Sequence, residues 1–178
     1  MRAFLALPLP PGLCELLAAR ARAVPGLRAQ APGTIHLTLR FLGEIEETER
    51  VAEAVRPAAK ACRPFDLELV GLGAFPHPGA ARVLWAGVGG GAGEATALAA
   101  AVESALAPLG FPRETRPFRP HVTLGRFSSP RRLPAPLLDL PPALGTARAD
   151  RLILYRSTLT PRGALHQPAV EMSLGGGM

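Results

Sequence analysis

Residues 34–43 have the sequence TIHLTLRFLG, and residues 120–127 repeat much of this stretch as PHVTLGRF. Both copies contain a histidine, an aliphatic residue, a threonine and a leucine in the same order, beginning at His36 and at His121. An arginine and a phenylalanine follow each copy, and the second copy has an additional glycine before them. A repeated His-x-Thr-Leu motif is therefore the most distinctive feature of the chain.

The alternation of side chains in a strand places the polar residues of each motif together. Successive side chains of an extended strand point to opposite faces, so His36 and Thr38 share one face and the aliphatic residues share the other. His121 and Thr123 share a face of the second strand in the same way. Two such strands side by side would bring two imidazoles and two hydroxyls together. We therefore predict a shared site at the two motif strands.

The additional glycine of the second motif affects the arginine that follows it. By strict alternation Arg126 would point away from His121. A β-bulge at Gly125 would return Arg126 to the histidine face, because a bulge adds one residue to one strand of a pair. We therefore predict a bulge at Gly125 and include Arg126 in the site.

The first motif has no such glycine, so strict alternation is expected there. Arg40 would share the face of His36, which makes it a further side chain that could contact a substrate. Phe41 would alternate away from the histidine face, and Phe127 would do so unless the bulge intervenes. Packing in the core is therefore favoured over base stacking for both phenylalanines.

Composition allows a folded protein and a polyanionic partner. The chain has 178 residues, of which 48% are hydrophobic, enough for one large domain or two small lobes. The formal net charge is +6, and Lys60 is the only lysine. The arginine excess has two interpretations: a compositional bias from a GC-rich genome or hot habitat, and a surface that attracts nucleic acid.

Nothing in the sequence predicts a metal, a cofactor or a membrane span. Cys14 and Cys62 do not form a CxxC pair, and the four histidines lack clustered carboxylates, so a zinc site is not expected. His77 and His166 lack partners at any motif spacing and are predicted to lie at the surface. No apolar run reaches membrane length. We expect a cytoplasmic protein in a reducing compartment.

Hydrophobic periodicity divides the chain into strands and helices. Pro57 is expected to bend or end its helix, the proline-rich residues 128–147 are expected to form an irregular surface segment, and residues 175–178 are expected to be disordered. The predicted strands are 2–9, 34–43, 65–72, 82–88, 120–127, 151–160 and 165–174, and the predicted helices are 13–24, 46–61 and 94–109.

The order of these elements contains an internal repeat. A strand, a helix and a motif strand occur twice, and the two motif histidines are 85 residues apart. We therefore predict an α+β fold in which residues 1–178 form one bilobal domain, duplicated over approximately 1–75 and 80–160. The seam between two such lobes is where a pocket tends to form.

Further segments add a family resemblance to these observations. The opening RAFLALPLP, the segment GLGAFP at 71–76 and LYRSTL at 154–159 accompany the two motifs. Together they resemble the 2H phosphoesterase superfamily, specifically the bacterial and archaeal RNA 2',3'-cyclic phosphodiesterases once called 2'-5' RNA ligases. The resemblance implies two lobes, each an antiparallel sheet with helices packed outside, and a central cleft between them. It also implies opening of 2',3'-cyclic phosphates to 2'-phosphates without a metal.

The resemblance also implies roles for the motif residues. His36 would be the proton donor and His121 the proton acceptor, while Thr38, Thr123 and Arg126 would bind the phosphate. These residue types suit the chemistry, because histidine can hold or release a proton near neutrality and hydroxyl and guanidinium groups stabilise phosphate charge. The pseudo-symmetry of the motifs leaves the opposite order of acid and base open.

Two alternatives to the hydrolase remain. A 2'-5' RNA ligase would run the same reaction backwards with a ribose hydroxyl as nucleophile, using RNA or tRNA halves. An RNA-binding protein without catalysis would keep the fold, but it would have no need for two acid-base residues on one face. The expected partner is RNA with a 2',3'-cyclic phosphate end or a small cyclic nucleotide, and the expected state is a monomer.

Overall fold

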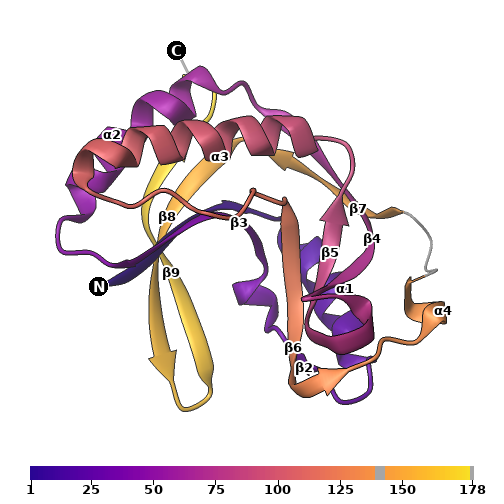
Figure 1. Ribbon diagram of the computed structural model, residues 1–178. Helices are drawn as coiled ribbons and strands as arrows, with labels where there is room; N and C mark the ends of the chain where they lie inside the picture. The colour runs from indigo at the N-terminus through magenta and orange to yellow at the C-terminus, as the bar shows by residue number, and fades with distance from the viewer. Residues whose placement is uncertain (139–142, 177–178) are drawn as a thin grey trace.

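The computed structural model describes residues 1–138 and 143–176, which form two antiparallel sheets with helices against them (Figure 1). Sheet A contains, in spatial order, β3 (His36–Glu44), β1 (Arg2–Pro8), β8 (Arg151–Thr160) and β9 (Gly163–Ser173). Sheet B contains β2 (Arg28–Ala29), β6 (His121–Arg131), β5 (Ala81–Val88), β4 (Phe65–Phe75) and β7 (Ala143–Ala149). This architecture confirms the predicted α+β class.

The helices are α1 (Pro11–Arg22), α2 (Thr48–Ala61), α3 (Ala92–Leu106) and the short α4 (Ala135–Leu138). Single 3₁₀ turns lie at Pro32–Thr34, Pro78–Ala80 and Ala107–Leu109. The predicted strands and the three longer helices are thus present, with boundaries shifted by a few residues. The glycine run before α3 forms a turn in which Gly91 has a φ of +85°, a conformation that side chains disfavour.

Two proline-rich segments differ in part from expectation. Of the two outcomes expected at Pro57, an end of the helix does not occur: α2 continues to Ala61, with Pro57 exposed so that the carbonyl that its missing N–H leaves free can bond to water. Residues 128–147 are not irregular throughout: β6 extends to Arg131 and β7 pairs with β4 at the edge of sheet B. Small residues fill much of β7, so its alternation is weak in the sequence.

The helix of each predicted repeat packs on the sheet that contains the motif strand of the other repeat. Helix α3, which joins β5 to β6, contacts β3 of sheet A, whereas α1, which follows β1, contacts β6 and β7 of sheet B. Helices α2 and α3 lie side by side above sheet A (Figure 1). This exchange ties the two halves together. The duplication itself stays a prediction.

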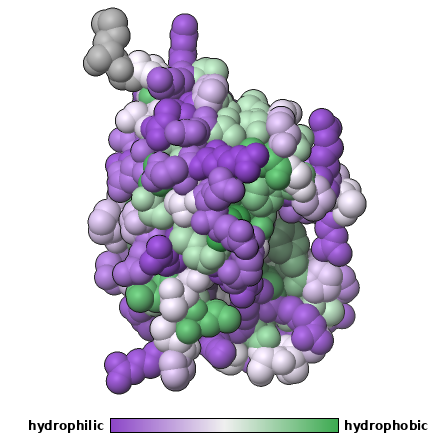
Figure 2. Space-filling model, turned by 90° about the vertical axis from the view of Figure 1, so that its left-hand side faces the viewer, coloured by the Kyte–Doolittle hydropathy of each residue, from purple (hydrophilic) through white to green (hydrophobic). Residues whose placement is uncertain are grey.

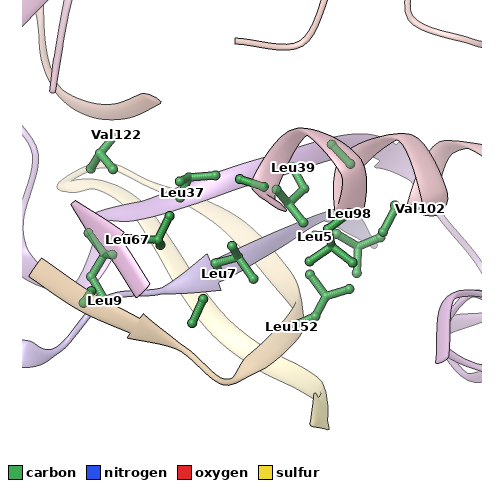
Figure 3. Packing of buried hydrophobic residues seen from close by; sticks show 14 of the residues in the cluster. Leu5, Leu7, Leu9, Leu37, Leu39, Leu67, Leu98, Val102, Val122 and Leu152 are labelled. Carbon is green, nitrogen blue, oxygen red and sulfur yellow. The ribbon is translucent and has the colours of Figure 1, made fainter. Parts of the chain in front are cut away.

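One apolar cluster extends across both sheets (Figure 3). Leu5 of β1 and Leu39 of β3 lie near Leu98 of α3, and the same cluster includes Leu67 and Val122 of sheet B. Burial of such side chains contributes about 1.5–3 kcal/mol each. The core therefore fixes one face of each motif strand and leaves the opposite face for the polar residues.

Outside the core the molecule carries mainly polar side chains. Figure 2 shows hydrophilic residues over much of one face, with separate apolar groups between them. No helix within the described residues has the length and apolar character needed to cross a membrane. Near the C-terminus, Gly175 N donates a hydrogen bond to Ala59 O at 3.2 Å. The expected disorder of 177–178 falls outside the described residues.

Candidate active site

The two motif strands lie at the junction of the sheets. Strands β3 and β6 contact each other, although each belongs to a different sheet. Strand β2 also bridges the sheets, because it pairs with β6 and is followed within a few residues by β3. His36 and His121 stand outside the apolar core that contains their neighbours Leu37 and Val122. The two motif strands are therefore neighbours in space, although they are not paired within one sheet.

A bulge in β3 changes the faces of the residues that follow Thr38. Leu5 pairs with Arg40 and Ala6 pairs with Thr38, so the register shifts at Leu39. Phe41 consequently lies 5.9 Å from the ring of Phe4, with 66% of its surface exposed. The expectation that Phe41 packs in the core was therefore wrong.

Arg40 is buried by the same bulge and does not reach the site. Only 7% of its side chain is exposed, Nη2 donates to the carbonyl of Pro112, and Nη1 lies 2.5 Å from a carboxylate oxygen of Glu114. The latter contact is an ion pair without hydrogen-bonding geometry. Glu114 N in turn donates to Glu103 of α3 at 2.6 Å. The expectation that Arg40 contacts substrate was wrong; it anchors the segment that leads to β6.

The Arg40 ion pair gives a prediction about stability. Replacing Glu114 with alanine leaves a buried guanidinium without its counter-charge, which costs about 3–5 kcal/mol where both partners are buried. Glu114 is 59% exposed, so we expect a loss of about 2 kcal/mol in the free energy of unfolding. Urea unfolding measures this loss. The double variant Arg40→Met with Glu114→Ala should recover part of it; wild-type stability in Glu114→Ala alone would contradict the assignment.

Strand β6 has the predicted bulge, although the unpaired residue is Leu124 rather than Gly125. Leu84 pairs with Gly125 and Trp85 pairs with Thr123, so Leu124 is the additional residue. Arg126 is exposed, as expected for a residue returned to the histidine face. Gly125 is required by close packing, since a Cβ there would lie 2.7 Å from the carbonyl oxygen of Arg28.

An arginine that the sequence did not single out stands beside Arg126. Arg28 of β2 is directly opposite Arg126 in the antiparallel pairing, and both are exposed. Like charges directly opposite each other in a sheet are destabilising. A phosphate between them would remove that repulsion. Only this cross-strand register, which sequence spacing does not show, relates the two arginines.

His121 is held by one backbone contact and two aromatic rings. Its Nδ1 lies 2.6 Å from the carbonyl oxygen of Arg119. The imidazole meets Phe75 edge-on at 4.9 Å and lies 6.1 Å from Trp85. A carbonyl can only accept a hydrogen bond, so Nδ1 carries the proton and Nε2 of the neutral ring keeps a free lone pair.

His36 occupies an aromatic environment in sheet A. Its ring stacks on Phe4 at 4.7 Å and lies 5.8 Å from Tyr155. Burial lowers the pKa of His36 to about 3, and the nearby His166 contributes to this lowering. The imidazole is therefore neutral at pH 7 in the free protein.

The lowered pKa of His36 makes stability depend on pH. The unfolded chain takes up this proton near pH 6.5, whereas the folded chain does so only near pH 3. Stability therefore falls as the pH falls from 6.5 toward 3, by up to about 1.4 kcal/mol per unit. The His36→Gln variant lacks this contribution, so wild type should lose stability relative to it. Urea unfolding at several pH values in this window measures the difference; a pH-independent difference would contradict the burial of His36.

A third histidine, predicted to lie at the surface, lies beside His36. The ring of His166 is 5.2 Å from that of His36 and 4.8 Å from Phe4. Burial lowers the pKa of His166 as well. The surface prediction for His166 was therefore wrong. His166 belongs to no motif, so the sequence gives no sign of its position, and the pairing of β9 with β8 places it beside His36. His77, by contrast, is exposed, as predicted.

The motif threonines line the same strands. Thr38 pairs with Ala6, Thr123 pairs with Trp85, and both threonines are half-buried. Their neighbours at alternate positions belong to the core, which directs the hydroxyls to the histidine side. Phe127, by contrast, is buried as predicted.

An apolar cavity lies apart from the two motif histidines. This cavity of about 280 Å³ lies between α1 and sheet B, where Leu17, Val24 and Leu84 contribute to its lining. It contains neither motif histidine, and its lining has few polar groups that could perform chemistry. Among residues 1–138 and 143–176, no three His, Cys, Asp or Glu side chains form a group that could hold a metal.

Comparison with known proteins agrees with the arrangement of motifs and sheets. A model of the 2'-5' RNA ligase superfamily matches residues 9–160. The chain belongs to this superfamily. A relative from Aeropyrum pernix, named RNA 2',3'-cyclic phosphodiesterase, is 40% identical over 141 residues, which cover 77% of this chain and 80% of that protein. A Thermus thermophilus relative of the same name is 34% identical over an alignment that covers 99% of this chain and 91% of that protein.

Solved structures of the superfamily share the fold. A protein of Thermus thermophilus aligns with a TM-score of 0.81 and 31% identity over 99% of both chains. E. coli LigT in complex with 3'-AMP aligns with a TM-score of 0.77 and 29% identity over 97% of both chains. These alignments confirm the two-sheet architecture that the resemblance implied.

Proposed function

We propose that this protein is an RNA 2',3'-cyclic phosphodiesterase that opens terminal 2',3'-cyclic phosphates to 2'-phosphates. One observation carries the proposal: two His-x-Thr strands from different sheets contact each other, with both histidines outside the apolar core. The names of the superfamily relatives support the same activity. The reaction needs a base for the attacking water and an acid for the leaving oxygen, and a histidine pair supplies both.

His121 is suited to be the proton acceptor. The carbonyl of Arg119 fixes the proton on Nδ1, so the lone pair of Nε2 is available to the attacking water. The aromatic contacts with Phe75 and Trp85 hold the ring in one orientation. As the water attacks phosphorus, its proton passes to Nε2 and His121 becomes an imidazolium.

His36 is then the proton donor, which requires that it be protonated when substrate is bound. Its pKa in the free protein is about 3. An anionic phosphate beside the ring favours the imidazolium and raises that pKa. His36 transfers this proton to the ribose 3' oxygen as the bond from phosphorus to that oxygen breaks, which leaves the phosphate on the 2' oxygen.

The remaining polar groups bind the phosphate oxygens. The hydroxyls of Thr38 and Thr123 donate hydrogen bonds, and Arg126 supplies a guanidinium whose paired N–H groups match two phosphate oxygens. Arg28 is close enough in the sheet register to add a second positive charge. These groups stabilise the charge that develops in the transition state.

The reverse reaction uses the same groups. A ribose 5'-hydroxyl in place of water would give a 2'-5' linkage, so ligation of RNA ends is a second activity compatible with this site.

We propose RNA ends as the main substrate, with small cyclic nucleotides as minimal substrates, because the net charge of +6 favours a polyanion. Both motif strands come from one chain, which is consistent with a monomer, and the free cysteines are consistent with the reducing cytoplasm.

The test is hydrolysis of a short RNA ending in a 2',3'-cyclic phosphate, with excess chelator present. We expect complete conversion to a terminal phosphomonoester, which a gel resolves by its additional charge, at a rate unaffected by the chelator. A mixture with a 5'-hydroxyl RNA would reveal ligation as a longer product. Binding of the RNA without conversion would favour the non-catalytic alternative and contradict the proposal.

A further inference from the structure

His166 lies on strand β9, opposite Ser157 of β8, and its side chain reaches the aromatic group around His36. Phe4 contacts both imidazoles, with the ring of His36 stacked on it at 4.7 Å and that of His166 edge-on at 4.8 Å. The two imidazole centroids are 5.2 Å apart. The mechanism above assigns no task to this third ring.

The two nitrogens of His166 have different surroundings. Nδ1 is buried and lacks a hydrogen-bond partner among the described residues. Nε2 does not share this combination of burial and a missing partner. Buried N–H groups without an acceptor are rare, so the proton of the neutral ring belongs on Nε2. Burial keeps the pKa of His166 low, which favours this neutral form. The ring therefore presents one N–H donor beside His36.

We propose that His166 is a further substrate-contacting residue, whose Nε2–H donates a hydrogen bond to a non-bridging oxygen of the phosphate that His36 serves. This inference rests on the proposed function. Rings with centroids 5.2 Å apart can reach different oxygens of one phosphate group. A neutral donor suits this position because a positive charge on His166 would oppose protonation of His36.

The first test compares two substitutions of His166 in the hydrolysis of the cyclic phosphate RNA. His166→Phe keeps the aromatic contact with Phe4 but removes the donor, so kcat/KM should fall about 10- to 100-fold, the range for a hydrogen bond to a charged group. His166→Gln keeps an N–H donor, and its kcat/KM should stay within about threefold of wild type. His77→Phe, at an exposed histidine between β4 and β5, is the control, and its kcat/KM should equal that of wild type.

Two results would overturn the proposal: a His166→Phe variant as active as wild type, or a His166→Gln variant as impaired as His166→Phe. An inactive wild-type enzyme would contradict the proposed function instead, and would leave the second test decisive for phosphate contact.

The second test measures binding to the wild-type protein and needs no turnover. Wild-type protein is titrated with inorganic phosphate while ¹H–¹⁵N NMR follows the imidazole nitrogens, which are assigned with histidine variants. We expect the Nε2 signal of His166 to shift together with the signals of His36, while those of His77 stay unchanged. A His166 signal that is unaffected while His36 responds would overturn the contact.

Discussion

Replacing His36 or His121 with alanine is expected to lower turnover of a 2',3'-cyclic phosphate RNA by about 10²- to 10⁴-fold in each case. Each substitution removes one of the two proton transfers, and water replaces the lost group poorly. Both rings are half-buried and outside the apolar core, so the fold should survive. Initial rates under saturating substrate, with circular dichroism of each variant, measure the effect.

The control for these variants is His77→Ala, which changes an exposed histidine whose ring nitrogen accepts a local hydrogen bond from Gly79 N at 3.2 Å. It should keep the wild-type rate. The double variant of His36 and His121 should lose little more activity than either single variant, because residues that act as a unit are not additive. Wild-type turnover in both single variants would end the acid-base assignment.

Replacing Arg126 with alanine is expected to lower kcat/KM by about 10²- to 10³-fold, comparable to the loss of one donor to a transition-state oxyanion. The bulge at Leu124 and Gly125 is what places this guanidinium on the histidine side. Lysine should restore only part of the activity, because it keeps the charge but not the paired donors. Steady-state kinetics on the same RNA measures both variants.

A matched control is Arg22→Ala, at an exposed arginine of α1, the helix that packs on the core side of sheet B. It removes the same charge from the molecule without touching the site. Equal losses in Arg22→Ala and Arg126→Ala would indicate a general electrostatic effect on RNA binding and would contradict a phosphate contact for Arg126.

The two bulges show how far the sequence could predict the site. The bulge in β6 has a visible signal in the sequence, because the second motif copy contains Gly125, which has no counterpart in the first copy. The bulge in β3 has no such signal, since Leu39 is an ordinary strand residue. Alternation therefore predicted the wrong side for Arg40 and Phe41, although it placed His36 and Thr38 correctly.

Contacts between distant strands explain the other differences. His166 enters the site through the pairing of β9 with β8 and the pairing of β8 with β1, neither of which leaves a local pattern in sequence. Strand β7 was missed because alanine, glycine and threonine give little hydrophobic alternation. The exchange of α1 and α3 between the sheets is likewise a tertiary feature. Local periodicity predicted most elements, whereas the partners of each element depend on the whole fold.

The measurement that tests the central claim most directly is phosphorus NMR of the product formed from a 2',3'-cyclic phosphate RNA in excess chelator. With His36 protonating the 3' oxygen and His121 activating water, we predict a 2'-phosphate as the sole product. The signal should fail to appear with His36→Ala and with His121→Ala. A 3'-phosphate would reverse the leaving group and contradict these roles, and a reaction that stops in chelator would contradict catalysis by the histidine pair.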